Sequence, residues 1–432
     1  EAILMSSPYK TFSIKSFGCK VNLADSSSIS KKLIKSGFSL VDFNDQADLY
    51  IVNTCSVTNN ADMKAEKFIK EINSKAPESK IIITGCYAQL NPDRLLKNKG
   101  VDMVIGTEDK LKIEKYLSQI DNPEKFITNI KDVNDFNITH TSSERTRSFI
   151  KIQDGCNYNC TYCTIPNARG KSRSDSIEKT VSKINSIVES GINEVVLSGI
   201  NVGDFGTKTE TFYMLLKKIE KIKSLKRYRI SSIEPNLLNS QIIKLLSKSI
   251  KALPHLHIPL QTGSDKVLKD MKRRYTVTYY KKLINNIANL IPNICIGVDV
   301  IVGFPTETSE DFISTYEFLE QLPISYLHVF SYSKRVNTEA ENFDNIVTKE
   351  EMLYRRKVLQ KLSQKKFNEH IERNIGTVHD VLFENEKNEM MQGLSGNYIR
   401  INVKTNKNLN NLIKKVKIIK SENEIILGEI IG

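Results

Sequence analysis

The chain has 432 residues, of which 40% are hydrophobic and 26% charged, and it carries a formal net charge of +13. This length exceeds what one hydrophobic core usually supports, so we expect two or three domains. The composition excludes a disordered or fibrous protein. No apolar run is long enough to span a membrane and the start shows no signal-peptide pattern, so we expect a cytoplasmic protein. The basic balance favours a polyanionic partner, most simply RNA, although a general abundance of lysine would give the same charge.

The seven cysteines point to a reducing compartment and to metal ligation, because the chain does not look secreted. Six of them fall into two groups of three. The seventh, Cys295, lies in the apolar, strand-like run 294–302. We predict that Cys295 is a buried thiol that acts as a small hydrophobic side chain.

Short apolar runs alternate with helical patterns over the first 110 residues. This alternation predicts a doubly wound parallel sheet with covering helices. The expected strands cover 9–17, 47–52, 80–84 and 101–105, and the expected helices cover 27–36, 62–74 and 92–97.

One cysteine follows each of the first three predicted strands by one to three residues: Cys19, Cys55 and Cys86. Their separations of 36 and 31 residues match the length of a βαβ unit. Strand carboxyl ends share one edge of a parallel sheet, where ligands bind. We therefore predict that the three thiols converge on one crevice and form a three-thiolate site. The alternative is three unrelated buried cysteines.

The second segment is predicted to begin within 141–147. Six strand patterns separated by helical patterns predict a partial (β/α)6 barrel, with its functional groups at the carboxyl ends of the strands. The predicted strands cover 148–153, 194–198, 228–233, 255–260, 296–302 and 326–332.

The first of these strands leads into three cysteines with the spacing C-x3-C-x2-C: Cys156, Cys160 and Cys163. Clusters that only carry electrons usually have four cysteine ligands, so three thiolates on a [4Fe–4S] cluster leave one iron open to bind something else. The candidate is S-adenosylmethionine (SAM), chelated through its amino and carboxylate groups. Zinc ligands or core residues are the alternative interpretation of three cysteines.

A long charged helix over 349–373 is predicted to lead away from the barrel. The remaining residues contain short strand patterns over 377–383, 398–403, 412–419 and 425–431, which predict a small all-β barrel. The predicted domains are therefore 8–140, 141–374 and 375–432.

The motifs in this order resemble the radical SAM methylthiotransferases over nearly the whole chain. That family combines an N-terminal methylthiotransferase domain, a radical SAM barrel and a C-terminal TRAM domain. The matching motifs are Gly18-Cys19-Lys20-Val21-Asn22, Asn53-Thr54-Cys55-Ser56-Val57-Thr58, Thr84-Gly85-Cys86-Tyr87-Ala88-Gln89, Cys163-Thr164-Ile165-Pro166, Ser198-Gly199-Ile200-Asn201-Val202-Gly203, Ser231-Ser232-Ile233-Glu234-Pro235, His257-Ile258-Pro259-Leu260-Gln261, Gly303-Phe304-Pro305-Thr306-Glu307 and His328-Val329-Phe330.

The resemblance implies two [4Fe–4S] clusters and SAM as cofactors. The cluster on Cys156, Cys160 and Cys163 would bind and cleave SAM to a 5′-deoxyadenosyl radical. The cluster on Cys19, Cys55 and Cys86 would carry the sulfur that is inserted. The residues expected around SAM are Tyr162, Ser198, Gly199, Glu234, Gln261 and Val329.

The form of the first motif, with Lys20 and Val21, resembles the branch of the family that acts on N6-threonylcarbamoyladenosine beside the tRNA anticodon. The expected partners are then the tRNA anticodon stem-loop and an electron donor such as flavodoxin or ferredoxin, with the chain as a monomer. Lys20 and Arg169 are the expected partners of the carboxylate on the modified base. Arg169, Lys171 and Arg173 are the expected phosphate contacts.

Three alternatives remain open at this point. Two lie within the family: action on N6-isopentenyladenosine in tRNA, and action on a ribosomal protein. The third is a zinc-stabilised RNA-binding protein without catalysis. The sequence departs from the family at Asn337, where we expect glycine; this changes a loop and touches no cluster ligand.

Overall fold

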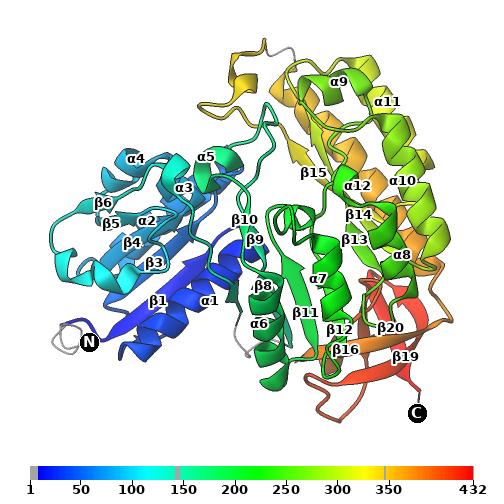
Figure 1. Ribbon diagram of the computed structural model, residues 1–432, viewed down its shortest axis with the longest axis horizontal. Coiled ribbons are helices and arrows are strands. Elements are labelled where there is room, and N and C mark those ends of the chain that lie inside the picture. The colour runs from blue at the N-terminus through cyan, green and yellow to red at the C-terminus, as the bar shows by residue number, and fades with distance from the viewer. Residues whose placement is uncertain (1–7, 142–145, 345–346, 432) are drawn as a thin grey trace.

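The computed structural model describes residues 8–141, 146–344 and 347–431. It contains an N-terminal α/β domain, a central partial barrel and a small C-terminal β-barrel, as Figure 1 shows. This is the α/β organisation that the sequence predicts.

The N-terminal sheet is six-stranded and wholly parallel, in the order β2-β1-β3-β4-β5-β6. Hydrophobic clusters cover both of its faces, one packed around Ile29 and Leu33 and the other around Ala65 and Ile69, so the sheet is doubly wound. Its strands are β1 (Thr11–Ser16), β2 (Ser39–Leu40), β3 (Leu49–Thr54), β4 (Lys80–Gly85), β5 (Val101–Ile105) and β6 (Glu124–Phe126), and its helices are α1 (Lys20–Lys35), α2 (Asn59–Lys75), α3 (Cys86–Leu90) and α4 (Pro92–Leu96).

The strand order places a topological switch point between β1 and β3, because β2 lies outside β1 while β3 and β4 continue on the other side. Open α/β sheets bind ligands in the crevice at such a point. The local sequence explains the helix starts that flank it: α2 begins after Thr58, whose hydroxyl accepts a hydrogen bond from the Ala61 backbone N–H.

Six parallel strands and the short antiparallel edge strand β7 form the partial barrel as two sheets, in the orders β12-β11-β8-β7 and β13-β14-β15. A bridge between Ser232 and His257 joins the two sheets. Among the described residues β8 does not pair with β15, so the barrel stays open on that side. The strands are β7 (Thr139–His140), β8 (Arg147–Lys151), β11 (Glu194–Ser198), β12 (Arg227–Ile230), β13 (His255–His257), β14 (Cys295–Val302) and β15 (Tyr326–Ser331), and a short pair is formed by β9 (Gln153–Asp154) and β10 (Arg173–Ser174).

Amphipathic helices cover the outside of the barrel and enclose one large apolar core with its strands. Side-chain caps begin most of them; Thr308, for example, forms a capping box with Asp311 at the start of α11. The helices are α5 (Ile165–Arg169), α6 (Ile177–Glu189), α7 (Phe212–Ile219), α8 (Ser240–Lys248), α9 (Asp265–Asp270), α10 (Val277–Leu290), α11 (Ser309–Gln321) and α12 (Lys349–Glu372).

The C-terminal residues form a closed five-stranded barrel in the order β16-β17-β18-β20-β19, which agrees with a TRAM-like domain. β17 was not predicted from the sequence, because this strand contains a glycine and its polar and apolar residues alternate little. The strands are β16 (Val378–Lys387), β17 (Met390–Ser395), β18 (Arg400–Val403), β19 (Ile413–Glu422) and β20 (Ile425–Ile430).

Two buried arginines attach this small barrel to the central one. Arg227 donates to the carbonyl oxygens of Asp380 and Leu394, and Arg229 donates to those of Ser395 and Gly396. Glu194 pairs with both guanidinium groups. The C-terminal barrel is therefore docked on the central barrel by buried polar contacts and is not a loosely tethered tail.

The predicted domain boundaries need qualification at one point. β7 pairs with β8, so the last residues assigned to the N-terminal domain extend the sheet of the central barrel. The predicted junction at 141–147 falls partly on residues 142–145, which lie outside the described residues.

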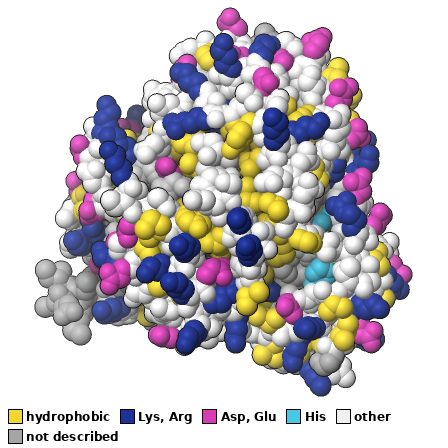
Figure 2. Space-filling model, turned by 45° about the vertical axis from the view of Figure 1, so that its right-hand side comes forward, with side chains coloured by type: hydrophobic (Ala, Val, Ile, Leu, Met, Phe, Trp, Pro, Cys, Tyr) yellow, Lys and Arg dark blue, Asp and Glu magenta, His cyan; other side chains and the backbone are white. Residues whose placement is uncertain are grey.

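Two further predictions can be compared with the structure. Cys295 is completely buried in the core, as expected for a thiol that acts as a hydrophobic side chain. No helix within the described residues is long and apolar enough to cross a membrane. Lys and Arg side chains are spread over the face drawn in Figure 2, and exposed hydrophobic side chains gather across its middle.

Candidate active site

The N-terminal cysteines converge at the carboxyl edge of the sheet. Cys19 is the N-cap residue of α1, Cys55 follows β3, and Cys86 is the first residue of α3. The strands that precede these three cysteines are β1, β3 and β4, which are neighbours in the sheet. Burial, followed by the charges of Cys86 and Cys19, raises the pKa of Cys55 to about 12. A thiol with such a pKa becomes a thiolate at neutral pH when a metal binds it. The donor set therefore fits a cluster held by thiolates.

Gly18 allows this convergence. Its φ of +94° lies in the left-handed region, and a Cβ there would lie 2.8 Å from the Cys55 Sγ. Only glycine lets the chain turn into α1 while Cys19 and Cys55 approach each other.

We expect Gly18→Ala to lower the iron content of the N-terminal site, because the new methyl group displaces the Cys55 sulfur. Gly37→Ala is a matched control: Gly37 has almost the same φ, +93°, but no atom lies within 4 Å of the added Cβ. The control should cost only backbone strain, of about 1–2 kcal/mol. Iron and sulfide analysis of both variants measures the difference, and equal iron contents would contradict the role assigned to Gly18.

The second cysteine group lies on the loop after β9. The Cys163 N–H donates to the Cys160 carbonyl oxygen, and the Cys156 N–H donates to the Gly170 carbonyl oxygen, so the loop is folded on itself. Burial and then the Cys160 charge raise the pKa of Cys163 to about 12. Burial likewise raises the pKa of Cys156 to about 11. Thiols with these raised pKa values are protonated at neutral pH when free, and they become thiolates when a metal binds them. The donor set of this loop therefore also fits a metal-bound cluster.

Arg273 contacts two side chains of this loop and one beside it, and was not predicted from the sequence. Its Nη1 lies 3.2 Å from the Cys160 Sγ and 3.4 Å from the Tyr162 hydroxyl, and its Nη2 binds the Glu234 carboxylate. Arg273 follows α9, about 110 residues after the cysteines, in a segment with no motif. A guanidinium that donates to a thiolate stabilises the charged, metal-binding form.

A pocket of about 210 Å³ lies between the second cysteine loop, which contributes Cys163, and the segment that follows Cys55. Val57 and Thr58, directly after Cys55, form one wall, and Tyr162 and Cys163 form another. Gln261, Asp299 and Phe330 from the barrel strands complete it. The pocket thus brings together the N-terminal domain, the cysteine loop and the carboxyl ends of the barrel strands.

Two of the residues expected around SAM line this pocket, Tyr162 and Gln261. Gln261 has a φ of +76°, an unusual conformation for a side chain of this size and one that marks functional sites. Glu234 lies beside the cysteine loop through Arg273. Ser198 and Gly199 lie at the end of β11 as expected, but the Ser198 hydroxyl bonds to its own strand at Val196.

Val329, the last residue expected around SAM, is half-buried on β15. Its side chain packs against the apolar core, whereas its neighbour Phe330 lines the pocket.

The assignment of Arg169 as an RNA-phosphate contact is also corrected. Arg169 is 1% exposed and lies between the two cysteine groups, on α5. Its Nε lies 3.2 Å from the Cys86 Sγ, its Nη1 lies 2.9 Å from Asp154, and its Nη2 binds the Asn22 side chain. All three side-chain nitrogens are thus engaged within the protein, and the buried guanidinium is not accessible to an RNA phosphate.

Arg169 belongs to a buried charge network across the domain interface. Lys110 and Lys151 contact Asp25 at 2.6 and 2.8 Å, and both also approach Asp154. Three buried cations thus face two carboxylates, and a Cys86 thiolate would balance the remaining charge. Burial raises the pKa of Cys86, and the Arg169 charge opposes this rise. The network fits the metal-bound state of Cys86.

The other residues predicted to contact RNA differ in how exposed their charged groups are and in how many partners those groups already have. Lys171 is exposed. Arg173 is tied to the carbonyl oxygens of Asp135 and Lys171. The Lys20 ammonium lies over the Phe149 ring, 5.9 Å from its centroid, and no described carboxylate pairs with it. Burial, with repulsion from Arg229 and Arg147, lowers the pKa of Lys20 to about 8.

Arg335 connects the end of the barrel to the Cys55 loop. Its buried guanidinium binds the Ser56 hydroxyl at 2.6 Å and Asp62 at 2.7 Å. Close by, Asn337 has a φ of +64°, which explains why glycine is expected there and why asparagine is tolerated. No cysteine is among the hydrogen-bond partners of Asn337.

Of the His, Cys, Asp and Glu side chains described, three place their ligand atoms within 4.8 Å of one another: His257, Asp299 and His328. No described cysteine belongs to this group.

The central barrel with its three-cysteine loop has the architecture of a radical SAM domain, and the model of the Radical SAM superfamily matches residues 150–319. A second model, described as "Uncharacterized protein family UPF0004", matches residues 11–106. The solved radical S-adenosylmethionine methyltransferase TsrM from Kitasatospora setae shares the fold, with a TM-score of 0.58 and 14% identity over 74% of this chain and 73% of that one.

Curated relatives match over most of the chain. The threonylcarbamoyladenosine tRNA methylthiotransferase MtaB of Bacillus subtilis is 35% identical over 95% of this chain and 94% of its own length. The MtaB of Aquifex aeolicus is 37% identical over 93% and 98%. A tRNA-2-methylthio-N(6)-dimethylallyladenosine synthase of Thermodesulfovibrio yellowstonii is 33% identical over 87% and 88%. The chain therefore belongs to the radical SAM methylthiotransferases and is an enzyme of that family.

Proposed function

We propose that the enzyme replaces the C2 hydrogen of N6-threonylcarbamoyladenosine in tRNA by a methylthio group. The observation that carries this proposal is the pair of three-cysteine groups, one at the carboxyl edge of the N-terminal sheet and one on the loop that lines the pocket. The similarity to relatives named for this substrate, at 35–37% identity, supports the branch. The isopentenyl-type relatives are only slightly less similar, so substrate choice must be tested directly.

Each cysteine group would hold one [4Fe–4S] cluster. The clusters and SAM supply, when bound, the one-electron chemistry that an unreactive aromatic C–H bond requires. Arg273 holds the Cys160 sulfur, Tyr162 and Glu234 in one group, and Arg169 does the same for Cys86 and Asp154. Tyr162, Phe330 and Val57 give the pocket part of its aromatic and apolar lining.

Lys20 is the residue that we assign to the carboxylate of the threonylcarbamoyl group. A carboxylate that enters the protein without a partner is costly, so its pocket needs a cation. Lys20 follows the proposed ligand Cys19 directly, and none of the ion pairs among the described residues involves its ammonium, which lies over the Phe149 ring. Arg169 is not assigned this role because its guanidinium is buried and each of its nitrogens already has a partner within the protein.

We expect the reconstituted enzyme to convert threonylcarbamoylated stem-loop RNA to its 2-methylthio form and to leave isopentenylated RNA unchanged. Nucleoside mass spectrometry after digestion measures both products. Activity only on the isopentenylated RNA, or equal activity on both, would overturn the branch. Absence of activity on either RNA, with methylthiolation of a ribosomal protein, would overturn the RNA substrate.

The Lys20→Gln variant sharpens this test. It should raise the KM for the threonylcarbamoylated RNA, because the substrate carboxylate loses its cation. Uncoupled SAM cleavage reports on the intact site and should persist. An unchanged KM would remove Lys20 from the substrate pocket.

A further inference from the structure

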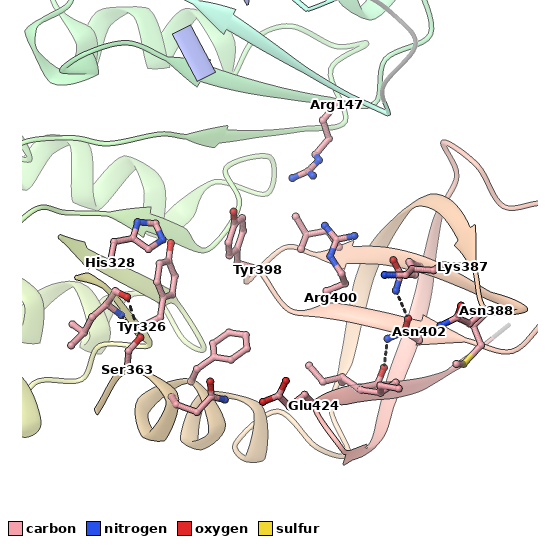
Figure 3. Close-up of a pocket in the computed structure, with 18 residues that line it drawn as sticks. Arg147, Tyr326, His328, Ser363, Lys387, Asn388, Tyr398, Arg400, Asn402 and Glu424 are labelled. Atoms are coloured by element: carbon pink, nitrogen blue, oxygen red, sulfur yellow. Dashed lines mark hydrogen bonds between the residues drawn. The ribbon is translucent and has the colours of Figure 1, made fainter. Parts of the chain in front are cut away.

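A second cavity, of about 670 Å³, lies between the central barrel and the C-terminal barrel. It opens where β8 and β15 do not pair. Figure 3 shows Tyr326 and His328 on one side, Arg400 and Asn402 on the other, Arg147 reaching in from the start of β8, and Glu424 at the opposite margin. The volume is ample for a nucleotide, and none of the chemistry derived above uses this cavity.

A row of aromatic side chains links this cavity to the pocket beside the second cysteine loop. Tyr326, His328 and Phe330 alternate along β15 and therefore share one face, and Tyr332 directly follows the strand. The first two line the second cavity and the last two line the first pocket. The His328 side chain is 54% exposed and Phe330 is 42% exposed. Part of each ring is therefore accessible along the path from the second cavity to the first pocket.

The walls of the second cavity are basic. Arg147, Lys387 and Arg400 line it against one acid, Glu424. Glu384 lies behind them and pairs with both arginines, at 2.8 Å from Arg400. Even with Glu384 counted, three cations face two carboxylates, so a phosphate entering here meets a surplus of positive charge.

Tyr398 stands at the centre of the cavity in a strained conformation. Its φ is +68°, a region that bulky residues avoid. The strain brings its ring against His255, with centroids 4.1 Å apart, and fills the floor below Tyr326. Strain of this kind persists where the surrounding structure imposes it, typically at ligand sites.

Aromatic rings combined with a basic groove form the usual binding surface for unpaired nucleotides, because every base offers a face for stacking. We propose that this cavity binds a nucleotide that flanks the modified adenosine in the substrate loop, with its base on His328 and its phosphate near Arg147 and Arg400. The inference rests on the proposed function, since it requires an RNA substrate. The aromatic row on β15 would then lead the substrate loop from this cavity to the pocket beside the second cysteine loop.

Binding of a fluorescently labelled anticodon stem-loop to the full-length protein tests the phosphate contact. Arg400→Gln should lower the slope of log affinity against log salt by about 0.7, the value for one phosphate contact on a single strand. Lys125→Gln is the matched control: Lys125 is 43% exposed and paired with Asp93, whereas Arg400 is 47% exposed and paired with Glu384. The control should leave the slope unchanged.

Abasic substitution of each nucleotide flanking the modified adenosine tests the stacking. One such substitution should weaken binding to the wild type by about 5- to 100-fold. The same substitution should weaken binding to His328→Ala by less than about twofold, because the stacking partner is already absent. Tyr398→Asn, which tolerates the positive φ, is a second variant for this cycle and guards against a folding defect in the first.

The outcomes separate the inference from the function on which it rests. If the losses of binding free energy from the abasic RNA and from the protein variant add fully, while the enzyme still forms the 2-methylthio product, the cavity assignment is overturned and the proposed function stands. A wild type that fails to bind the RNA but binds a ribosomal-protein peptide overturns both. Loss of additivity at one flanking nucleotide supports the assignment and identifies the base.

Discussion

Replacing Cys156, Cys160 and Cys163 together by alanine should abolish SAM cleavage and leave one cluster per chain. These thiols lie on a single loop, so removing them removes every protein ligand of that site while leaving the sheet that carries the N-terminal group intact. Iron and acid-labile sulfide should fall by half, and no 5′-deoxyadenosine should form. Retention of SAM cleavage in this variant would contradict the assignment of the loop.

The complementary variant, with Cys19, Cys55 and Cys86 replaced by alanine, is its control. Iron should again fall by half, but 5′-deoxyadenosine should still form, because the loop and Arg273 are unchanged. No methylthio product should appear. A variant that keeps both clusters would show that these three thiols do not bind iron.

Much of this site can be predicted from the sequence, because the cysteine positions depend on short, local sequence patterns. The strand that ends before each N-terminal cysteine can be recognised from its apolar run, and parallel strands must bring their carboxyl ends together. The spacing of Cys156, Cys160 and Cys163 is equally local. These features therefore appear in the structure where the sequence places them.

The errors concern side chains whose environment is set by distant segments. Arg169 looks like one member of an exposed basic run, yet α5 packs between two domains and buries it against Asn22 and Cys86. Arg273 shows no motif, and its contact with Cys160 depends on the fold of the barrel.

The second large effect is expected on stability, from a substitution in the buried charge network. Asp25→Asn leaves the Lys110 and Lys151 ammonium groups without their closest partner inside the domain interface. Breaking a buried ion pair by removing one partner costs about 3–5 kcal/mol. We expect a loss of this size in the free energy of unfolding, measured by chemical denaturation. Asp93→Asn is the control, because Asp93 is 70% exposed and its pair with Lys125 should contribute at most about 1 kcal/mol.

The same network predicts how stability depends on pH. Burial alone would raise the pKa of Asp25, but Lys110 and Lys151 outweigh it and lower the pKa to about 2. A carboxylate whose pKa is lower in the folded state than its unfolded value of about 3.9 stabilises the fold above pH 4. That contribution is lost as the pH falls from about 4 to about 2. Wild-type stability should therefore drop over this interval more steeply than that of Asp25→Asn, whose residue 25 does not titrate. Parallel curves for the two proteins would show that Asp25 is not held as a carboxylate between the two lysines.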